Sequence, residues 1–272
     1  MVRSILIGIS GTRCSQSAAA YALELAKKHR ASLLGVAVVD VSSLCPLESV
    51  PLSAGAYKYQ RDEAVLTAAR QALSQSLVEF TQQATAAGVT SRTMQLDGNP
   101  AEVLVAESQR TDLIVVGKRC APDEDFEQTS GTARAVLYQA ARPILCVPQD
   151  PAGGNAVLVA YDGSLQSAKT LQLFVASGLA AEREIHLLTI ADDAAPIAQR
   201  GIEFLHAHDL RVNAHLEAGN HPARQILETA SRLNAGLIVM GAYGQPRLRE
   251  FMFGSVTKAI LRESRIPLFL YH

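Results

Sequence analysis

The sequence VLVAYDGS at residues 157–164 is an apolar run that ends in an aspartate and a glycine-containing turn. The run ILIGISGT at residues 5–12 has the same organisation near the start of the chain. Later segments match in the same order: GNPA at 98–101 with GNHPA at 219–223, DLIVVG at 112–117 with GLIVMG at 236–241, and RPILCV at 142–147 with RIPLFL at 265–270. Landmarks matched in one order indicate an internal duplication.

Short apolar runs alternate with helical segments in both halves of the chain, as residues 5–9 and 32–39 illustrate. Strands that are apolar throughout are typical of parallel sheets covered by helices on both faces. The segment PQDPAGGN at residues 148–155 is typical of a linker. We therefore predict an α/β protein of two tandem doubly wound (Rossmann-like) domains, at residues 1–148 and 155–272.

The second half carries the parts of an anion-binding loop. A buried strand is expected to end at Gly241, a loop turns at Gly244, and a helix begins at Gly254 and Ser255. Glycines let the backbone approach a ligand closely, and the first amides of a helix bind anions. Asp162 follows the first strand of this half, where its carboxylate can accept hydrogen bonds from an adenine amino group or a ribose hydroxyl. Alternatively, the glycines only make a tight connection between strand and helix.

Asp162, the spacing G-x-x-G-x9-G-S from Gly241, and the segment V-T-x-x-I-L-x-x-S-x-x-P from Val256 resemble the universal stress protein family. The resemblance covers the whole chain as two family domains in tandem. It implies a five-stranded parallel sheet in each domain, in the order 3-2-1-4-5. It also implies that members commonly dimerise through their last strands. Here residues 143–147 and 266–271 would make that pairing within one chain, as an intramolecular pseudo-dimer, and a homodimer of two chains is left open.

The resemblance further implies an adenine nucleotide as ligand, namely ATP, or ADP or AMP, with or without magnesium. In ATP-binding members the aspartate and nearby backbone hold adenine, while the glycine loop and the serine hold ribose and phosphates. Tyr243 stands where the family often has a histidine, so the contact made there is not carried over. The nucleotide-binding residues implied for this chain are Asp162, Met240, Gly241, Gly244, Gly254, Ser255 and Val256.

The matching loop of the first half departs from this pattern. It contains GKRC at residues 117–120, nine further residues, and then Ser130 and Gly131, so the glycine–serine pair is reversed. Ser10 takes the position that Asp162 has in the second half. The loop therefore lacks most of the features that the second half carries.

The charge of the first-half loop also differs. Residues 121–129 carry four carboxylates, where residues 245–253 carry two arginines and one glutamate. Carboxylates repel phosphate groups, so we expect the first half to bind no nucleotide or to bind it more weakly. Thr132 and Lys118 keep the alternative of a phosphate contact open.

The composition limits the classes of partner. A formal charge of −1 and the absence of long like-charge runs argue against nucleic acid or anionic lipid. The sequence contains no uninterrupted run of about 18 apolar residues, as a membrane span would need. The first residues do not form a signal-peptide core, so we expect a cytoplasmic protein.

The cysteines and histidines do not predict a metal site. The cysteines form no CxxC pair and match no zinc spacing, so reduced thiols are expected. A redox pair of Cys14 and Cys120 near the first-half pocket is the alternative. His206 and His208 have no acidic or cysteine partner at ligand spacing. The four cysteines are Cys14, Cys45, Cys120 and Cys146.

The sequence favours a stress-response protein that binds ATP or a related adenine nucleotide as a regulatory ligand. It shows no Ser–His–Asp arrangement and no paired carboxylates beside the loop, so we predict no catalytic residues and weak ATPase activity at most. One alternative is an adenylating enzyme of the adenine-nucleotide hydrolase group. Such enzymes have a loop of the type S-G-G-x-D-S after the first strand, and SGTRCS at residues 10–15 resembles it only faintly. Another is a nucleotide-free scaffold for protein interactions.

Overall fold

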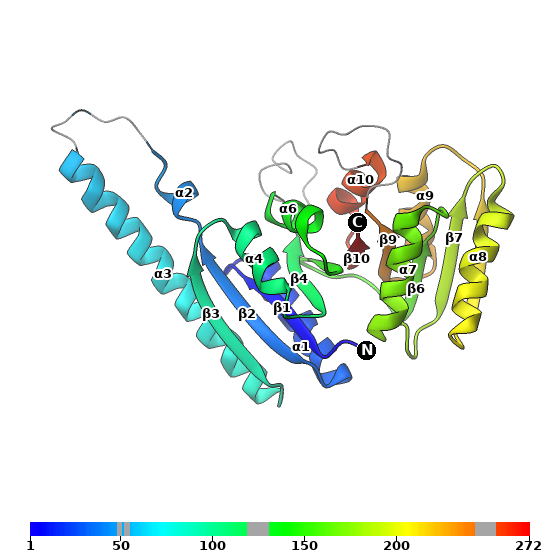
Figure 1. Ribbon diagram of the computed structural model, residues 1–272, viewed down its shortest axis with the longest axis horizontal. Helices are drawn as coiled ribbons and strands as arrows, with labels where there is room; N and C mark the ends of the chain where they lie inside the picture. Colours follow the sequence, from blue (N-terminus) through cyan, green and yellow to red (C-terminus); the bar gives the residue numbers. More distant parts are fainter. Residues whose placement is uncertain (48–50, 52–54, 119–130, 243–253) are drawn as a thin grey trace.

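The computed structural model describes residues 1–47, 51, 55–118, 131–242 and 254–272 (Figure 1). Strands and helices alternate in both halves, as expected. The first half contains β1 (Ser4–Ile9), α1 (Arg13–His29), β2 (Ser32–Val39), α2 (Val41–Leu44), α3 (Gly55–Ala86), β3 (Ser91–Asp97), α4 (Pro100–Ser108), β4 (Leu113–Lys118), α6 (Gly131–Gln139) and β5 (Ile144–Pro148). The second half contains β6 (Ala156–Ala160), α7 (Leu165–Ser177), β7 (Ile185–Ile190), α8 (Ala194–Ala207), β8 (Val212–Glu217), α9 (Pro222–Arg232), β9 (Ala235–Gly241), α10 (Ser255–Glu263) and β10 (Leu268–Tyr271).

The strands form one 10-stranded sheet in the order β3-β2-β1-β4-β5-β10-β9-β6-β7-β8. Within each half the strands are parallel and follow the order 3-2-1-4-5, which confirms the predicted fold class. The halves meet at β5 and β10, which run antiparallel with Leu145 opposite Phe269. The last strands of the two halves therefore pair within one chain, as the sequence led us to expect.

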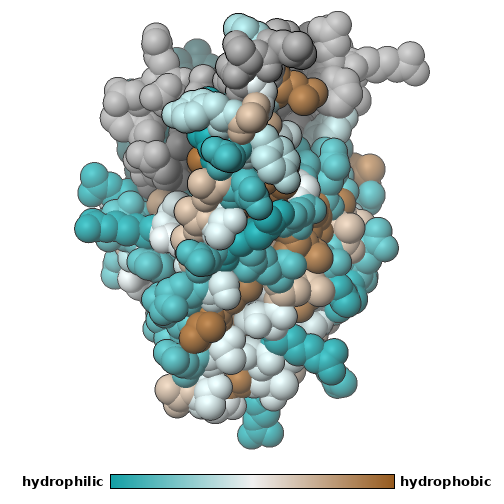
Figure 2. All heavy atoms as spheres, turned by 90° about the vertical axis from the view of Figure 1, so that its left-hand side faces the viewer, coloured by the Kyte–Doolittle hydropathy of each residue, from teal (hydrophilic) through white to brown (hydrophobic). Residues whose placement is uncertain are grey.

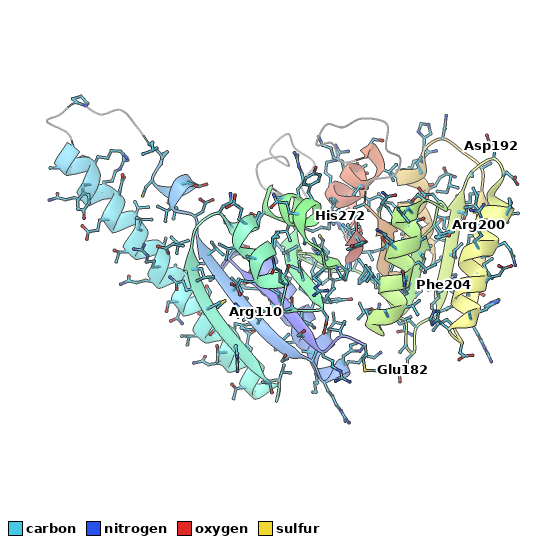
Figure 3. All side chains as sticks on the ribbon, viewed as in Figure 1. Arg110, Glu182, Asp192, Arg200, Phe204 and His272 are labelled. Carbon is cyan, nitrogen blue, oxygen red and sulfur yellow. The ribbon has the colours of Figure 1, made fainter. Side chains whose placement is uncertain are left out.

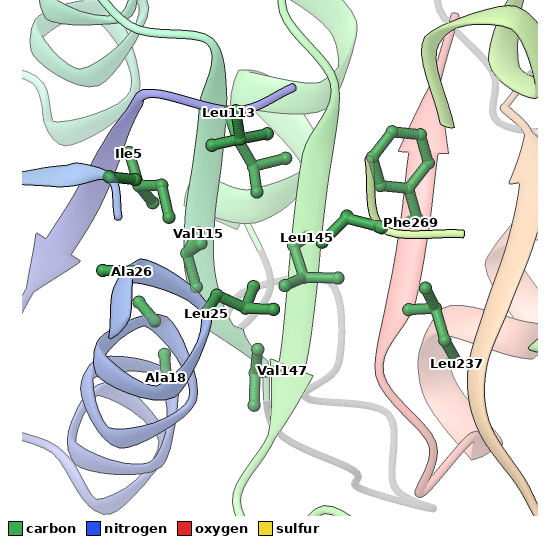
Figure 4. Packing of buried hydrophobic residues seen from close by; sticks show 14 of the residues in the cluster. Ile5, Ala18, Leu25, Ala26, Leu113, Val115, Leu145, Val147, Leu237 and Phe269 are labelled. Carbon is green, nitrogen blue, oxygen red and sulfur yellow. The ribbon is translucent and has the colours of Figure 1, made fainter. Parts of the chain in front are cut away.

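Helices cover both faces of the sheet and give the molecule three layers (Figure 1). The helices α1, α3, α7 and α8 pack on one face, and α4, α6, α9 and α10 pack on the other. Each face has a hydrophobic core that runs across the junction of the halves. Figure 4 shows Leu145, Leu237 and Phe269 at that junction. Phe174 of α7 packs edge-on against Phe269, with ring centroids 5.8 Å apart. Phe269 in turn lies opposite Leu145 of the first half and belongs to the same buried cluster, so the two halves share a continuous core.

The turn after the first strand of each half caps the helix that follows. Thr12 Oγ1 accepts a hydrogen bond of 3.3 Å from the Ser15 amide, and Ser164 Oγ accepts one of 3.2 Å from the Ser167 amide. A hydroxyl cap satisfies an amide that the helix itself leaves unpaired, and it typically stabilises by about 1 kcal/mol. The caps fix the starts of α1 and α7 beside the carboxyl ends of β1 and β6.

The halves differ most after their second strand. There α3 has 32 residues, whereas its counterpart α8 has 14. The buried residues of α3 are Leu77, Phe80 and Ala84, near its end, and its first part extends past β3 (Figure 1). Figure 2 shows this end of the molecule covered mainly by hydrophilic side chains, with hydrophobic ones scattered among them. No helix in the described residues combines the length and apolarity that crossing a membrane requires.

Phe269→Ala is expected to lower the free energy of unfolding of the whole chain by about 3–5 kcal/mol, because Phe269 is fully buried at the junction. Urea denaturation followed by circular dichroism measures the change. Phe204→Ala is the control, because Phe204 only packs against the edge of the same core. Equal losses in the two variants would contradict a core shared at the junction.

Candidate functional site

A cavity of about 320 Å³ lies at the carboxyl ends of β6, β7 and β9, bordered by the starts of α7, α9 and α10. Doubly wound sheets bind ligands at this edge, where the strand order reverses. Gly244 lies outside the described residues, as does Tyr243. The other residues predicted from the sequence all line this cavity, and they are Asp162, Met240, Gly241, Gly254, Ser255 and Val256.

Asp162 follows β6 and is exposed at the cavity. Its Oδ1 accepts a hydrogen bond of 2.9 Å from the Ser164 amide, which closes the turn into α7. Its Oδ2 has no hydrogen-bond partner among the residues that the structure describes. The side chain thus has one oxygen committed to the turn and a second that can accept a hydrogen bond from a ligand.

The start of α10 offers backbone donors to the cavity. Its N-cap is Gly254, which has no side chain to bond the first amides of the helix. The Gly254 carbonyl accepts the first helical bond from the Lys258 amide, at 3.1 Å. Amides at such a start carry the positive end of the helix dipole and favour an anion. The exposed Ser255 adds a hydroxyl in the first turn.

One wall of the cavity is apolar. Leu188 of β7, Ile226 of α9 and Met240 of β9 are buried and line it, with the half-buried Val256 beside them. An apolar wall next to a few polar groups is the usual composition of a small-molecule site. The cavity therefore combines a surface for an uncharged ring with donors for an anion.

Gly241 has a structural reason to be glycine that is independent of any ligand. A Cβ at this position would lie 2.8 Å from the Ser167 amide nitrogen and 2.9 Å from the Gln166 carbonyl carbon. Gly117 of the first half is in the same situation, with a Cβ 2.4 Å from the Cys14 carbonyl oxygen. In both halves this glycine lets the capped helix start pack directly on the end of a strand.

The sequence-based prediction missed part of the cavity lining. Ser164 and Ser167 line it from the start of α7, and Leu188 and Ile226 line it from β7 and α9. Ser164 is the last residue of the quoted VLVAYDGS, and Ile226 lies in the helix that begins at the proline of GNHPA. Those landmarks were visible as repeats, but their convergence on one cavity depends on how the strands are ordered.

The first half has a matching cavity of about 300 Å³, with different chemistry. Ser10 occupies the position of the carboxylate, and its hydroxyl lies 3.0 Å from Thr12 Oγ1. Cys14 and Thr132 also line it. The acidic residues 121–129 and Cys120 fall outside the described residues, so the proposed redox pair stays a prediction. The thiol of Cys146 lies elsewhere, in the core, where burial raises its pKa to about 12.

Lys118 differs from its sequence-based interpretation. We counted it as a candidate phosphate contact of the first half, but it is not among the described residues that line that cavity. Its ammonium instead donates hydrogen bonds to the Leu261 and Ser264 carbonyls, at 3.0 and 2.5 Å. These carbonyls lie at the end of α10, so the side chain reaches into the second half.

A histidine pair on β7 and β8 was also not predicted. His186 Nδ1 lies 2.9 Å from His215 Nε2, and His186 Nε2 lies 3.1 Å from the Glu184 carboxylate. Partial burial, followed by the neighbouring His186 and Arg232, lowers the pKa of His215. Among the described residues, no three His, Cys, Asp or Glu side chains are grouped so that they could hold a metal ion.

Comparison with known sequences identifies relatives along the whole chain. The model of the Universal stress protein family matches residues 1–148 and again residues 155–272. The chain is similar to Universal stress protein Slr1230 of Synechocystis sp. (strain ATCC 27184 / PCC 6803 / Kazusa), with 25% identity over 99% of this chain and 100% of that protein.

Solved structures share the architecture. A universal stress protein from Archaeoglobus fulgidus DSM 4304 superposes with a TM-score of 0.71 at 21% identity, covering 98% of this chain and 97% of that one. A putative universal stress protein from Pseudomonas aeruginosa UCBPP-PA14 gives a TM-score of 0.64 at 18% identity, covering 99% of this chain and 93% of that one. At these identities the likeness establishes a common fold.

Gly241→Ala is expected to lower the free energy of unfolding by about 1–3 kcal/mol, because the new Cβ would collide with the backbone of α7. Chemical denaturation measures the loss. Gly55→Ala is the matched control, because a Cβ there meets nothing within 4 Å. If both alanines were equally well tolerated, the close approach of α7 to β9 would not be what requires the glycine.

His215→Gln is expected to reduce the loss of stability on acidification. The pKa of His215 is lowered from 6.5, so the unfolded chain takes up protons first and stability falls as the pH drops below about 6.5. Burial also lowers the pKa of His29 and His272, so part of the dependence should remain. Urea midpoints at about pH 7.5 and about pH 5.5 measure the difference. An unchanged difference in the variant would rule out this contribution.

Proposed function

This chain belongs to the universal stress protein family, and we propose that it binds an adenine nucleotide in the cavity of its second half. ATP is the ligand we favour, with ADP or AMP as relatives that fit the same chemistry. The nucleotide would act as a regulatory ligand of a stress-response protein. Weak ATP hydrolysis is the most that the proposal includes.

One observation carries the proposal. A carboxylate acceptor, an apolar wall and the uncapped start of a helix come from separate segments of the chain and meet at one cavity. Asp162 Oδ2 can accept a hydrogen bond from the adenine amino group or a ribose hydroxyl. Leu188 and Met240 offer the apolar surface on which an adenine ring can lie. The amides at the start of α10, with Ser255, can bind the phosphates.

The first half is proposed to bind no nucleotide or to bind it more weakly. Its cavity is nearly as large, at about 300 Å³ against about 320 Å³, so volume does not distinguish the two. The difference is chemical, because Ser10 presents a hydroxyl, bonded to Thr12 Oγ1, where the second half presents the carboxylate of Asp162. The expected stoichiometry is therefore one nucleotide per chain.

Asp162→Asn is expected to weaken ATP binding about tenfold, equivalent to about 1.4 kcal/mol. Asparagine keeps an oxygen that can accept the Ser164 amide, so the turn survives, but it places a donor where the ligand needs an acceptor. Isothermal titration calorimetry of the full chain with ATP measures the affinity and the number of sites. Ser10→Ala is the matched control at the equivalent first-half position and should leave both unchanged.

Each other outcome has a defined meaning. Two sites per chain would show that the hydroxyl pair of the first half suffices for a nucleotide. Equal ATP affinity of the wild type and Asp162→Asn would show that the carboxylate does not contribute to nucleotide binding. No binding at about millimolar ATP would reject the nucleotide and favour the protein-interaction scaffold.

A further inference from the structure

Lys118 is a buried cation at the end of β4, with 3% of its surface exposed. Lysine is almost never buried to this degree unless its ammonium is paired. Here the ammonium donates to the Leu261 and Ser264 carbonyl oxygens, at 3.0 and 2.5 Å. A first-half side chain is thus inserted at the end of a second-half helix.

The two ends of α10 have complementary partners. Its start, at Gly254 and Ser255, borders the candidate nucleotide cavity, and its last turn presents the Leu261 carbonyl to Lys118. The last carbonyls of a helix lack helical partners, and a cation there also interacts favourably with the helix dipole. The nine-residue helix is about 14 Å long, so holding its end constrains the direction of its start.

The residue after α10 makes this attachment rigid. Ser264 is the C-cap, and its amide donates to the Ile260 carbonyl at 2.9 Å. Its hydroxyl donates to the Ile266 carbonyl at 2.8 Å and accepts from the Ile266 amide at 3.0 Å. The Ser264 carbonyl that Lys118 reaches therefore belongs to a hydrogen-bonded turn between α10 and β10. Movement of α10 would have to break the bonds to the ammonium or distort this turn.

The equivalent position of the second half carries no such donor. The position of Lys118 corresponds to Ala242 in the second half, because each follows the glycine that ends its strand, Gly117 or Gly241. Ala242 is fully buried and has no side-chain donor. At this position, therefore, the first half supplies a side-chain donor to a helix end and the second half has none.

We propose that Lys118 is a positioning residue of the nucleotide site in the second half: it holds α10 so that the first amides of the helix point at the phosphates. The proposal rests on the nucleotide function proposed above. It assigns the first half a supporting role in binding a polyphosphate that contacts only the second half. Lys118 acts on the phosphate end of the ligand and leaves the adenine end unaffected.

Lys118→Met in the full chain is expected to weaken ATP binding about tenfold, equivalent to about 1.4 kcal/mol, while adenosine binding stays unchanged. Methionine fills the buried space but offers no charge and no donor. Adenosine has no phosphates, so the ratio of the two affinities reports the phosphate end alone. Calorimetry with each ligand gives both dissociation constants.

Lys28→Met is the matched control. Lys28 also reaches from the first half to the second, with its ammonium 3.2 Å from the Glu182 carboxylate, but this pair is exposed. Glu182 lies at the lower edge of the molecule in Figure 3, whereas α10 lies at its upper edge. The control should bind ATP and adenosine like the wild type. An equal loss of both affinities in Lys118→Met, or no loss, would overturn the proposal.

Hydrogen exchange of the wild-type chain supplies a second test that needs no variant. ATP, compared with adenosine, should slow exchange along α10 and in the first-half segment that ends at Lys118. Slowing confined to the first turn of α10 would overturn the role of Lys118. A wild-type chain that binds adenosine but not ATP would also overturn it, whereas one that binds neither rejects the nucleotide site itself.

Discussion

The antiparallel pairing of β5 and β10 joins the five-stranded sheets of the two halves. Without it, each sheet would have an apolar strand at an exposed edge. All five residues of β5 are buried, and β10 is buried except at its last residue. An exposed strand edge of this composition would be free to pair with another chain. Pairing Leu145 with Phe269 removes both edges and merges the cores. This pairing sets the relative placement of the two sheets, within which the other contacts between the halves form.

The two halves share the same backbone arrangement but differ in the side chains that line their cavities. Both have a hydroxyl cap after the first strand, a glycine that lets the capped helix approach, and a cavity of about 300 Å³ or about 320 Å³. The differences lie in single side chains, such as Ser10 against Asp162 and Lys118 against Ala242. A duplicated fold can differ in this way, because the packing that both halves need is kept while the side chains that line each cavity change.

The sequence was sufficient for the features that depend on local pattern. The apolar runs predicted the strands, the repeat predicted two similar halves, and the resemblance to the family implied the strand order that both halves have. The sequence was insufficient where the role of a residue depends on a contact with a segment far away in the chain. Gly241 lines the cavity as predicted, but its close approach to the backbone of α7, which excludes a side chain there, could not be located from the sequence. Lys118 was counted toward the first-half pocket, because nothing local shows that α10 lies within its reach. The His186–His215 pair likewise arises only when β7 and β8 lie side by side.

Two of the contacts between the halves share one physical feature. Donors of the first half meet the carbonyl ends of second-half helices: Lys118 at the end of α10, and the backbone nitrogens of Met1 and Val2 at the end of α7. Both helices start at the second-half cavity. Because the last carbonyls of a helix need partners, binding them from outside fixes each helix along its axis. The two helix starts that border the cavity are therefore held in place from their far ends, by a half of the chain that does not line it.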